Sequence, residues 1–90
     1  MAQVQQSGMP ILLTGSGVVS ATGGSLLGFY VNTTTAGTIV IRNGGSAGTA
    51  VSGTITPAVG TFHAFPAYLT SGCYFTIANT LNVTAFFAAG

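Results

Sequence analysis

The sequence predicts an all-β fold, organised as a single small β-sandwich or jelly roll of about eight short antiparallel strands. Short apolar segments recur at spacings near ten residues and are separated by Gly, Asn, Ser and Pro, a spacing typical of sandwiches and barrels. No long window has the apolar spacing of a helix, and the helix-favouring residues Glu and Lys are absent. A length of 90 residues corresponds to one domain.

The best-defined strand covers residues 38–43. Its centre, Ile39-Val40-Ile41, is β-branched, and β-branched side chains favour a pleated strand over a helix. Because successive side chains of a strand point to opposite faces, Ile39 and Ile41 are expected in the core, with Val40 and Arg42 on the other face. The Asn-Gly-Gly that follows is a turn signal.

The other expected strands are shorter or less regular, and each is ended by turn residues. They cover residues 11–14, 18–21, 26–32, 49–56, 61–65, 73–78 and 83–88. In the third of these, alternation places Leu27, Phe29 and Val31 on one face. Residues 33–37 and 79–82 are expected to be turns that connect separate strands.

The chain divides into two regions. Residues 11–90 form the predicted β-sandwich domain, and residues 1–10 form a flexible N-terminal arm that is polar, rich in Gln and closed by Gly8 and Pro10. Chain ends of this kind are usually loose unless something holds them. The arm is therefore either a frayed end or a segment that orders on a neighbouring subunit, which makes Met9 and Pro10 candidate contact residues.

Charge is nearly absent from this chain. It has no Asp or Glu, and Arg42 is its only basic residue apart from one His, so charged residues make up 1% of the sequence against about 25% in an ordinary domain. A surface of Thr, Ser, Asn and Gly suits close contact with other protein, because few ionic groups must lose their water. Arg42 either points to solvent or pairs with a carboxylate at a chain terminus or on another protein, so it is a candidate contact residue.

The same inventory argues against an enzyme. General acid–base catalysis requires a positioned group that titrates near the working pH, and the chief candidates are His63 and Cys73. No carboxylate side chain is present to orient His63, and Cys73 alternates in phase with Phe75 and Ile77, which predicts a small buried hydrophobe. We therefore expect no catalytic residue, no cofactor and no metal site, since a structural zinc site needs about four Cys or His ligands.

Other classes of partner need residues that this sequence lacks. A nucleic-acid surface needs several Lys or Arg, a phosphate-binding loop needs a Lys after its glycines, and a membrane span needs about 18–20 apolar residues in a row. We accordingly expect no nucleic acid, no small-molecule substrate and no membrane among the partners. The first 25 residues contain no Lys or Arg, which argues against a secretory signal and for synthesis in the cytoplasm.

Phe86 and Phe87 are consecutive in the last expected strand. Their side chains point to opposite faces, so one belongs to the core, and the other is exposed or covered by a neighbour. Both are candidate contact residues on this ground. A core of this size is thin, and the single Cys cannot form an intrachain disulfide. Association with other copies is the remaining way to gain stability.

Four segments of the chain resemble small virion proteins of tailed bacteriophages. They are residues 24–32 (GSLLGFYVN), 37–43, 60–65 and 82–84, and the resemblance covers about residues 11–88. Proteins of this kind are single β-sandwich modules rich in apolar strands, Gly and Thr. The family consists of capsid decoration (cement) proteins and other accessory components of the particle, and it brings no catalytic residues.

The resemblance implies a capsid decoration protein that binds the outer capsid surface and stabilises the shell. Its expected location is the virion, after synthesis in the host cytoplasm, and its expected partners are the major capsid protein and copies of itself, as a homotrimer. The alternative is a tail, fibre or neck accessory protein that recognises glycans on the host surface. In that case Thr, Asn and Tyr side chains would contact sugar hydroxyls.

Overall fold

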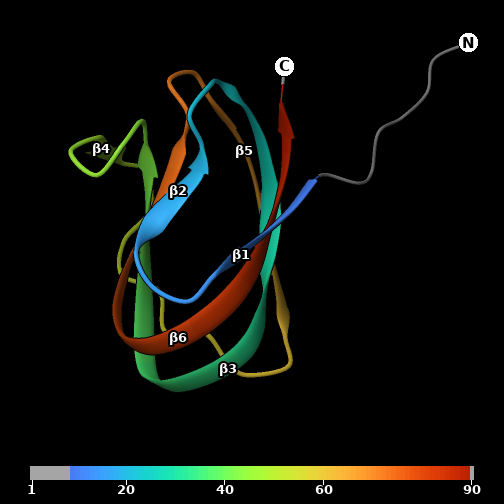
Figure 1. The fold of residues 1–90 in the computed structure, drawn as a ribbon, viewed down its shortest axis with the longest axis vertical. Helices are drawn as coiled ribbons and strands as arrows, with labels where there is room; N and C mark the ends of the chain where they lie inside the picture. The colour runs from blue at the N-terminus through green and yellow to red at the C-terminus, as the bar shows by residue number, and fades with distance from the viewer. Residues whose placement is uncertain (1–8, 90) are drawn as a thin grey trace, which may run out of the picture.

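The computed structural model describes residues 9–89 as six β-strands in one antiparallel sheet, with no helix among these residues (Figure 1). The strands are β1 (Met9–Leu13), β2 (Gly17–Ser20), β3 (Gly24–Asn43), β4 (Thr49–Ala50), β5 (Phe62–Leu69) and β6 (Cys73–Ala89). The prediction of an all-β antiparallel fold is confirmed. The prediction of about eight short strands is wrong, because the described residues form six strands, two of which are long.

β3 and β6 form one antiparallel ladder that runs through the whole sheet. Its register extends from the pair Gly24 and Ala89 to the pair Asn43 and Cys73. The two turns that the sequence predicts within this stretch are bends inside the strands and do not interrupt them (Figure 1). Four of the expected short strands therefore merge into two long ones.

Local backbone geometry explains the bends. Ala36 and Asn79 have positive φ angles of 54° and 62°, and bulges shift the register on the β3 side, which bends a strand. The Asn79 side-chain amide donates a hydrogen bond of 2.8 Å to the Ala36 carbonyl and so joins the two bends. Gly37 is required here, because a Cβ at this position would lie 2.6 Å from both the Leu81 Cβ and the Thr80 carbonyl oxygen.

The bends divide the sheet into two half-sheets. In the first half-sheet the order is β1, residues 83–89 of β6, residues 24–31 of β3, and β5. In the second half-sheet the order is β2, residues 73–78 of β6, residues 38–43 of β3, and β4. The sheet thus folds over its own middle, and β3 and β6 belong to both halves (Figure 1).

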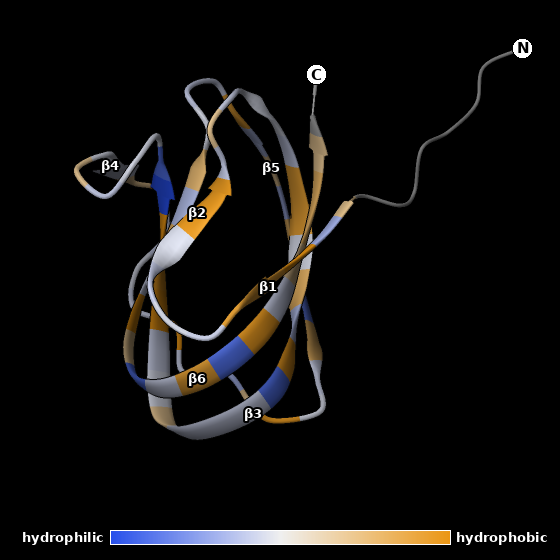
Figure 2. Ribbon diagram, viewed as in Figure 1, coloured by the Kyte–Doolittle hydropathy of each residue, from blue (hydrophilic) through white to orange (hydrophobic). Residues whose placement is uncertain are grey.

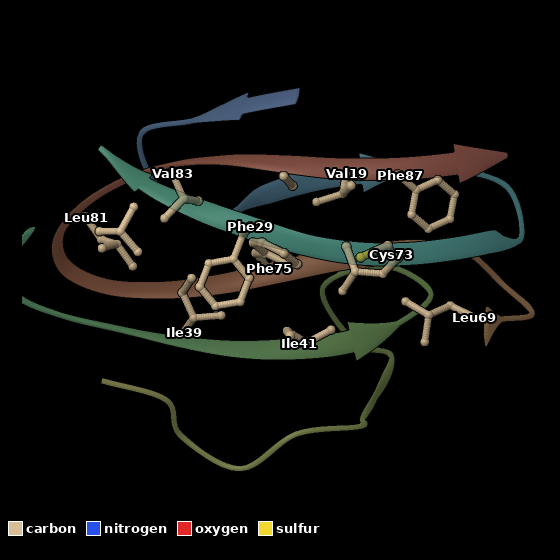
Figure 3. Packing of buried hydrophobic residues seen from close by; sticks show 13 residues of the cluster. Val19, Phe29, Ile39, Ile41, Leu69, Cys73, Phe75, Leu81, Val83 and Phe87 are labelled. Carbon is tan, nitrogen blue, oxygen red and sulfur yellow. The ribbon is translucent and has the colours of Figure 1, made fainter. Parts of the chain in front are cut away.

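The core lies between the two half-sheets. Phe29 of the first half-sheet meets Phe75 of the second edge to face, with ring centroids 5.6 Å apart (Figure 3). Ile39 and Ile41 are both fully buried, which confirms the predicted phase of residues 38–43. The buried hydrophobic side chains of the described residues are Val19, Leu26, Phe29, Val31, Ile39, Ile41, Leu69, Cys73, Phe75, Leu81, Val83, Ala85 and Phe87.

The predicted phase is wrong at the start of β3. Alternation predicts Leu27 on the same face as Phe29, but Leu26 is fully buried and Leu27 is half-buried. A bulge between Leu26 and Gly28 adds one residue to the strand, so that Leu26 and Phe29 both point inward. Gly28 has a φ of 153°, which a residue without a Cβ adopts readily. In parts of β3 and β6, apolar and polar bands alternate, as Figure 2 shows.

Two of the three prolines lie in the outer strands of the first half-sheet. β1 begins at Met9, two residues before the strand predicted there, and it contains Pro10. β5 passes through Pro66 to Leu69, although Pro predicts the end of that strand. Within the described residues each of these strands pairs on one side, and an edge strand tolerates a residue that cannot donate to a ladder. Residues 1–8 of the predicted arm lie outside the described residues, as does the last residue of the predicted domain.

The strand expected at residues 49–56 is reduced to β4 and one bridge between Ile39 and Ile55. The segment follows the edge of β3 but does not form a regular ladder with it. At Ile41 the N–H donates to the Ser52 hydroxyl at 2.9 Å, so a side chain replaces a backbone carbonyl as the acceptor. This replacement interrupts the ladder that alternation alone predicts.

Candidate interaction surface

His63 and Cys73 are joined by no hydrogen bond among the described residues. His63 lies on β5, where its ring stacks on Phe29 with centroids 5.2 Å apart and its Nε2 accepts a hydrogen bond of 3.4 Å from the Ala58 N–H. Cys73 lies opposite Asn43 at the start of β6. Within residues 9–89 no group of three His, Cys, Asp or Glu side chains is placed to hold a metal ion.

Cys73 has the environment of a structural residue. Its side chain is fully buried in the cluster that contains Phe75, with Ile77 packed against that cluster. Burial raises the pKa of the Cys73 thiol to about 12, because the thiolate would lose its hydration in the core. Cysteine acts as a nucleophile through its thiolate, so this thiol is poorly suited to that role. The prediction of a small buried hydrophobe is confirmed.

Arg42 lies on the outer surface of the second half-sheet and bonds to neutral acceptors of its own chain. Its Nε donates to Thr76 Oγ1 at 2.9 Å, and its Nη1 donates to the Gly48 carbonyl at 3.1 Å. The side chain is half-buried, so it does not simply extend into solvent. A contact between Arg42 and another chain stays a prediction.

Phe86 and Phe87 point to opposite faces of β6. Phe87 is 3% exposed and lies opposite Leu26 in the core. It is therefore not on a surface that a neighbouring chain can reach, which corrects its selection as a contact residue. Phe86 is half-buried on the outer surface, with its ring centroid 5.8 Å from that of Phe62.

Met9 and Pro10 are the first two residues of β1 and are both exposed. Pro10 lies opposite Phe86 in the register, on the outer surface, whereas Met9 lies opposite Phe87. The two residues thus belong to a strand of the sheet and not to a separate arm. Contact of Met9, Pro10 or Phe86 with another chain stays a prediction.

The outer surface of the first half-sheet is lined by aromatic and other apolar side chains. Phe62 of β5 lies beside Tyr30 of β3 in the register. Tyr30 lies beside Thr84 of β6, and Thr84 lies beside Leu12 of β1. Two further rows complete the surface. We call it the aromatic face, and its residues are Pro10, Leu12, Ser25, Gly28, Tyr30, Phe62, Ala64, Pro66, Tyr68, Thr84, Phe86 and Ala88.

The aromatic face exposes large side chains and no charge. Leu12, Phe62 and Tyr68 are 61%, 48% and 62% exposed, and the only Lys or Arg of the chain, Arg42, lies on the other half-sheet. Single exposed apolar residues are common, but a contiguous exposed apolar surface marks a site of interaction. The sheet therefore presents one surface with the composition of the centre of a protein interface.

Gly28 positions the rings at the centre of this face. A Cβ at Gly28 would lie 2.7 Å from Phe62 Cζ and would overlap the His63 carbonyl oxygen. The Phe62 ring therefore lies over the Gly28 backbone, against Phe86. Rings that are held in place before a partner arrives lose little conformational freedom on binding.

A polar group closes the aromatic face where the sheet bends. The Asn32 amide donates to Asn82 Oδ1 at 2.8 Å and to Thr84 Oγ1 at 3.1 Å. These hydrogen bonds fix the three side chains on the outer surface next to Tyr30. An apolar centre with a polar margin is the usual arrangement of a protein interface.

Sequence reasoning identified Pro10 and Phe86 of this face but missed Leu12, Phe62 and Tyr68. A signal was present in β5, where Phe62, Ala64, Pro66 and Tyr68 occur at every second position. It was hidden because Pro66 predicts the end of a strand, which separates Tyr68 from Phe62.

Comparisons with protein-family models, with curated proteins and with solved structures find no match to this chain. In the part of the chain that the structure describes, no helix has the length and apolar character needed to cross a bilayer.

Proposed function

We propose that this chain is a structural protein of a tailed-bacteriophage virion, namely a capsid decoration protein that binds the outer capsid surface and stabilises the shell. The observation that carries the proposal is the aromatic face, an exposed and uncharged surface on a regular sheet through which copies of the chain can associate on a shell. The virion part of the proposal comes from the resemblance of residues 24–32 and 60–65 to small virion proteins. Both segments contribute residues to the aromatic face.

The mechanism requires only surface contact. A ligand that binds the assembled shell better than its separate subunits shifts the equilibrium towards assembly. Each contact can be weak, because a repeated lattice offers many equivalent sites and linked copies bind with increased avidity. The outer surface beyond the aromatic face also fits this task, since a chain with 1% charged residues has few ionic groups to desolvate on docking.

We propose that this chain acts without catalysing a reaction. The Cys73 thiol is buried, with a pKa raised to about 12 by desolvation, and the His63 ring packs on Phe29. The sequence provides no carboxylate side chain to act with either of them. Replacing His63 with Gln is expected to leave shell binding unchanged.

The finer architectural part of the proposal is a β-sandwich module that clusters as a homotrimer on the major capsid protein. Contact between the inner faces of the two half-sheets, through Phe29 and Phe75, supports a sandwich-like arrangement of layers. A trimer would place copies on the threefold positions of a shell, and many small homo-oligomers have closed symmetry of this kind.

The test is a comparison of virus particles assembled with and without this chain. Image reconstruction is expected to show additional density repeated over the shell, and particles with the chain are expected to release their DNA at a higher temperature. Density confined to the single vertex that carries the tail would contradict a decoration role. Equal release temperatures would contradict stabilisation of the shell.

One observation favours a second candidate function, recognition of host glycans by a tail, fibre or neck component. Tyr30 is partly exposed beside the hydrogen-bonded group of Asn32, Asn82 and Thr84, and aromatic rings next to amides and hydroxyls suit the two surfaces of a sugar. The copy number per particle separates the candidates. Binding to a glycan array that is lost in Tyr30→Ala would support recognition over decoration.

A further inference from the structure

We infer that the aromatic face is the contact surface for a second copy of this chain, with sheet packed against sheet. The inference rests on the proposed function only in that copies associate. It identifies the surface they use and pairs them about a twofold axis in place of a trimer, because a surface that packs on its own counterpart relates two copies. The face has exposed apolar side chains on both of its outer strands, Leu12 on β1 and Phe62 on β5. A surface of this kind loses unfavourable contact with water when it is covered.

Charge identifies a second copy as the occupant. An ordinary protein surface brings many charged side chains, which would find no ionic group on the aromatic face and would be costly to bury there. The aromatic face of a second copy brings no charged side chain into the contact. The chain has no Asp or Glu, and its only Lys or Arg, Arg42, lies on the other half-sheet and bonds to Thr76. The aromatic face of another copy therefore matches this one in charge, with no repulsion and no unpaired ion.

The distribution of large and small side chains on the aromatic face also suits contact between sheets. Layers of packed sheets lie about 10 Å apart and interdigitate their side chains. Large exposed side chains, such as Tyr68 and Phe62, stand beside small ones, such as Ser25 and Ala64, in the same rows or the next. When both copies use the same surface, each large protruding side chain can pack into the gap above a small residue of the other copy.

The order of the central rings reduces the entropy cost of association. Phe62 lies over the Gly28 backbone with its centroid 5.8 Å from that of Phe86. Both rings are therefore positioned in the separate chain. Aromatic residues positioned in this way, at the centre of an interface, commonly contribute most of its affinity.

The experiment measures the oligomeric state of the purified full chain by size-exclusion chromatography with light scattering and by sedimentation equilibrium. The wild-type chain is expected to form oligomers in the absence of any shell. Phe62→Ser and Leu12→Ser are each expected to raise the dissociation constant by about tenfold or more, because each removes a large apolar side chain from the contact. Leu12 is 61% exposed, so its variant keeps the test valid if Phe62→Ser, which also loses the contact with Phe86, fails to fold.

Val18→Ser is the matched control. Val18 is 52% exposed and pairs with Tyr74 on the outer surface of the second half-sheet. Its replacement removes a similar apolar side chain from the other surface and is expected to leave the dissociation constant unchanged. Circular dichroism of all three variants checks that each keeps the β-sheet.

Three results would overturn the inference. The first is a wild-type chain that stays monomeric at its highest attainable concentration, whether or not it binds shells through this face. The second is an oligomer that resists Leu12→Ser but dissociates in Val18→Ser. The third is a monomer that associates only after removal of residues 1–8, which would assign the face to that segment. An oligomer that depends on Leu12 but ignores virus shells would retain the inference and reject the proposed function.

Discussion

The two half-sheets share the same pair of long strands but present different outer surfaces. In the first half-sheet the outward positions of β3 and β6 hold Tyr30 and Phe86, which belong to an uncharged aromatic surface. In the second half-sheet the corresponding positions hold Arg42 and Thr76, which bond to each other. Inward positions are apolar in both halves. The inward residues therefore determine the sheet, and the outward residues are free to differ according to what each surface contacts.

The largest expected effect comes from separating the two halves. Phe75→Ala removes the buried ring that meets Phe29 across the core, and a buried Phe→Ala change costs about 3–5 kcal/mol of unfolding free energy. A domain of this size has little more stability than that, so the variant is expected to be largely unfolded. Urea denaturation followed by circular dichroism measures the change. A loss below about 1 kcal/mol would mean that the two halves do not depend on this contact.

A smaller effect is expected within the first half-sheet. Gly28→Ala would place a Cβ against the His63 carbonyl and the Phe62 ring at a φ of 153°. Such strain costs about 1–3 kcal/mol, and it would also displace Phe62 from the aromatic face. Thermal unfolding measures the loss of stability, and sedimentation measures the loss of association.

Gly53→Ala is the matched control for the Gly28 variant. A Cβ at Gly53 would meet no atom within 4 Å, so the change is expected to alter stability by less than about 0.5 kcal/mol. Equal stabilities of the two variants would show that the close approach at Gly28 does not constrain the sheet.

Alkaline pH probes the inner surface of the second half-sheet. The pKa of Cys73 is raised from 9.0 to about 12 in the folded chain, so above pH 9 the unfolded chain releases a proton that the folded chain retains. The contribution of the protonated Cys73 thiol to the free energy of unfolding is complete below pH 9. It is lost as the pH rises towards 12, with a slope of up to about 1.4 kcal/mol per pH unit. Urea titrations from pH 8 to 10.5 are expected to show a steeper decline for the wild type than for Cys73→Ala. Parallel declines would show that the thiol is solvated in the folded state.

The smallest effect is expected on the outer surface of the second half-sheet. Arg42→Gln removes hydrogen bonds to Thr76 and to the Gly48 carbonyl, which are each worth about 0.5–1.5 kcal/mol when buried and less when half-exposed. We expect a loss of about 1 kcal/mol, with no change in the oligomeric state. Denaturation and sedimentation of the same sample test both parts. Dissociation of the oligomer by Arg42→Gln would remove the distinction between the two surfaces.

Alternation of residue types predicted the inner surface well. Ile39 and Ile41 in β3, and Cys73 and Phe75 in β6, are buried as their phase predicts, because a side-chain period of two is a property of the strand itself. The bends were not predictable in the same way. Ala36 adopts a left-handed conformation within a continuous strand, where its carbonyl accepts a hydrogen bond from the distant Asn79 amide.

The candidate surface was predictable only in part for a similar reason. Phe86 was identified because consecutive Phe residues must point to opposite faces, but the sequence does not reveal which of the two is buried. Leu12, Phe62 and Tyr68 were missed because they lie on two outer strands, β1 and β5, that the order of strands places on the same half-sheet. The order of strands, the bulge before Gly28 and the continuation of β5 through Pro66 do not follow from local composition.

The position of β6 in the sheet has a consequence for how the molecule is made. β6 pairs with β1, β2 and β3, and it follows all of them in the sequence. While a ribosome is still extending the polypeptide, the earlier strands lack the neighbour that completes their ladders, and their apolar sides face water. We therefore expect folding to wait until β6 has been translated, and unpaired strands of nascent chains to be able to pair with one another until then.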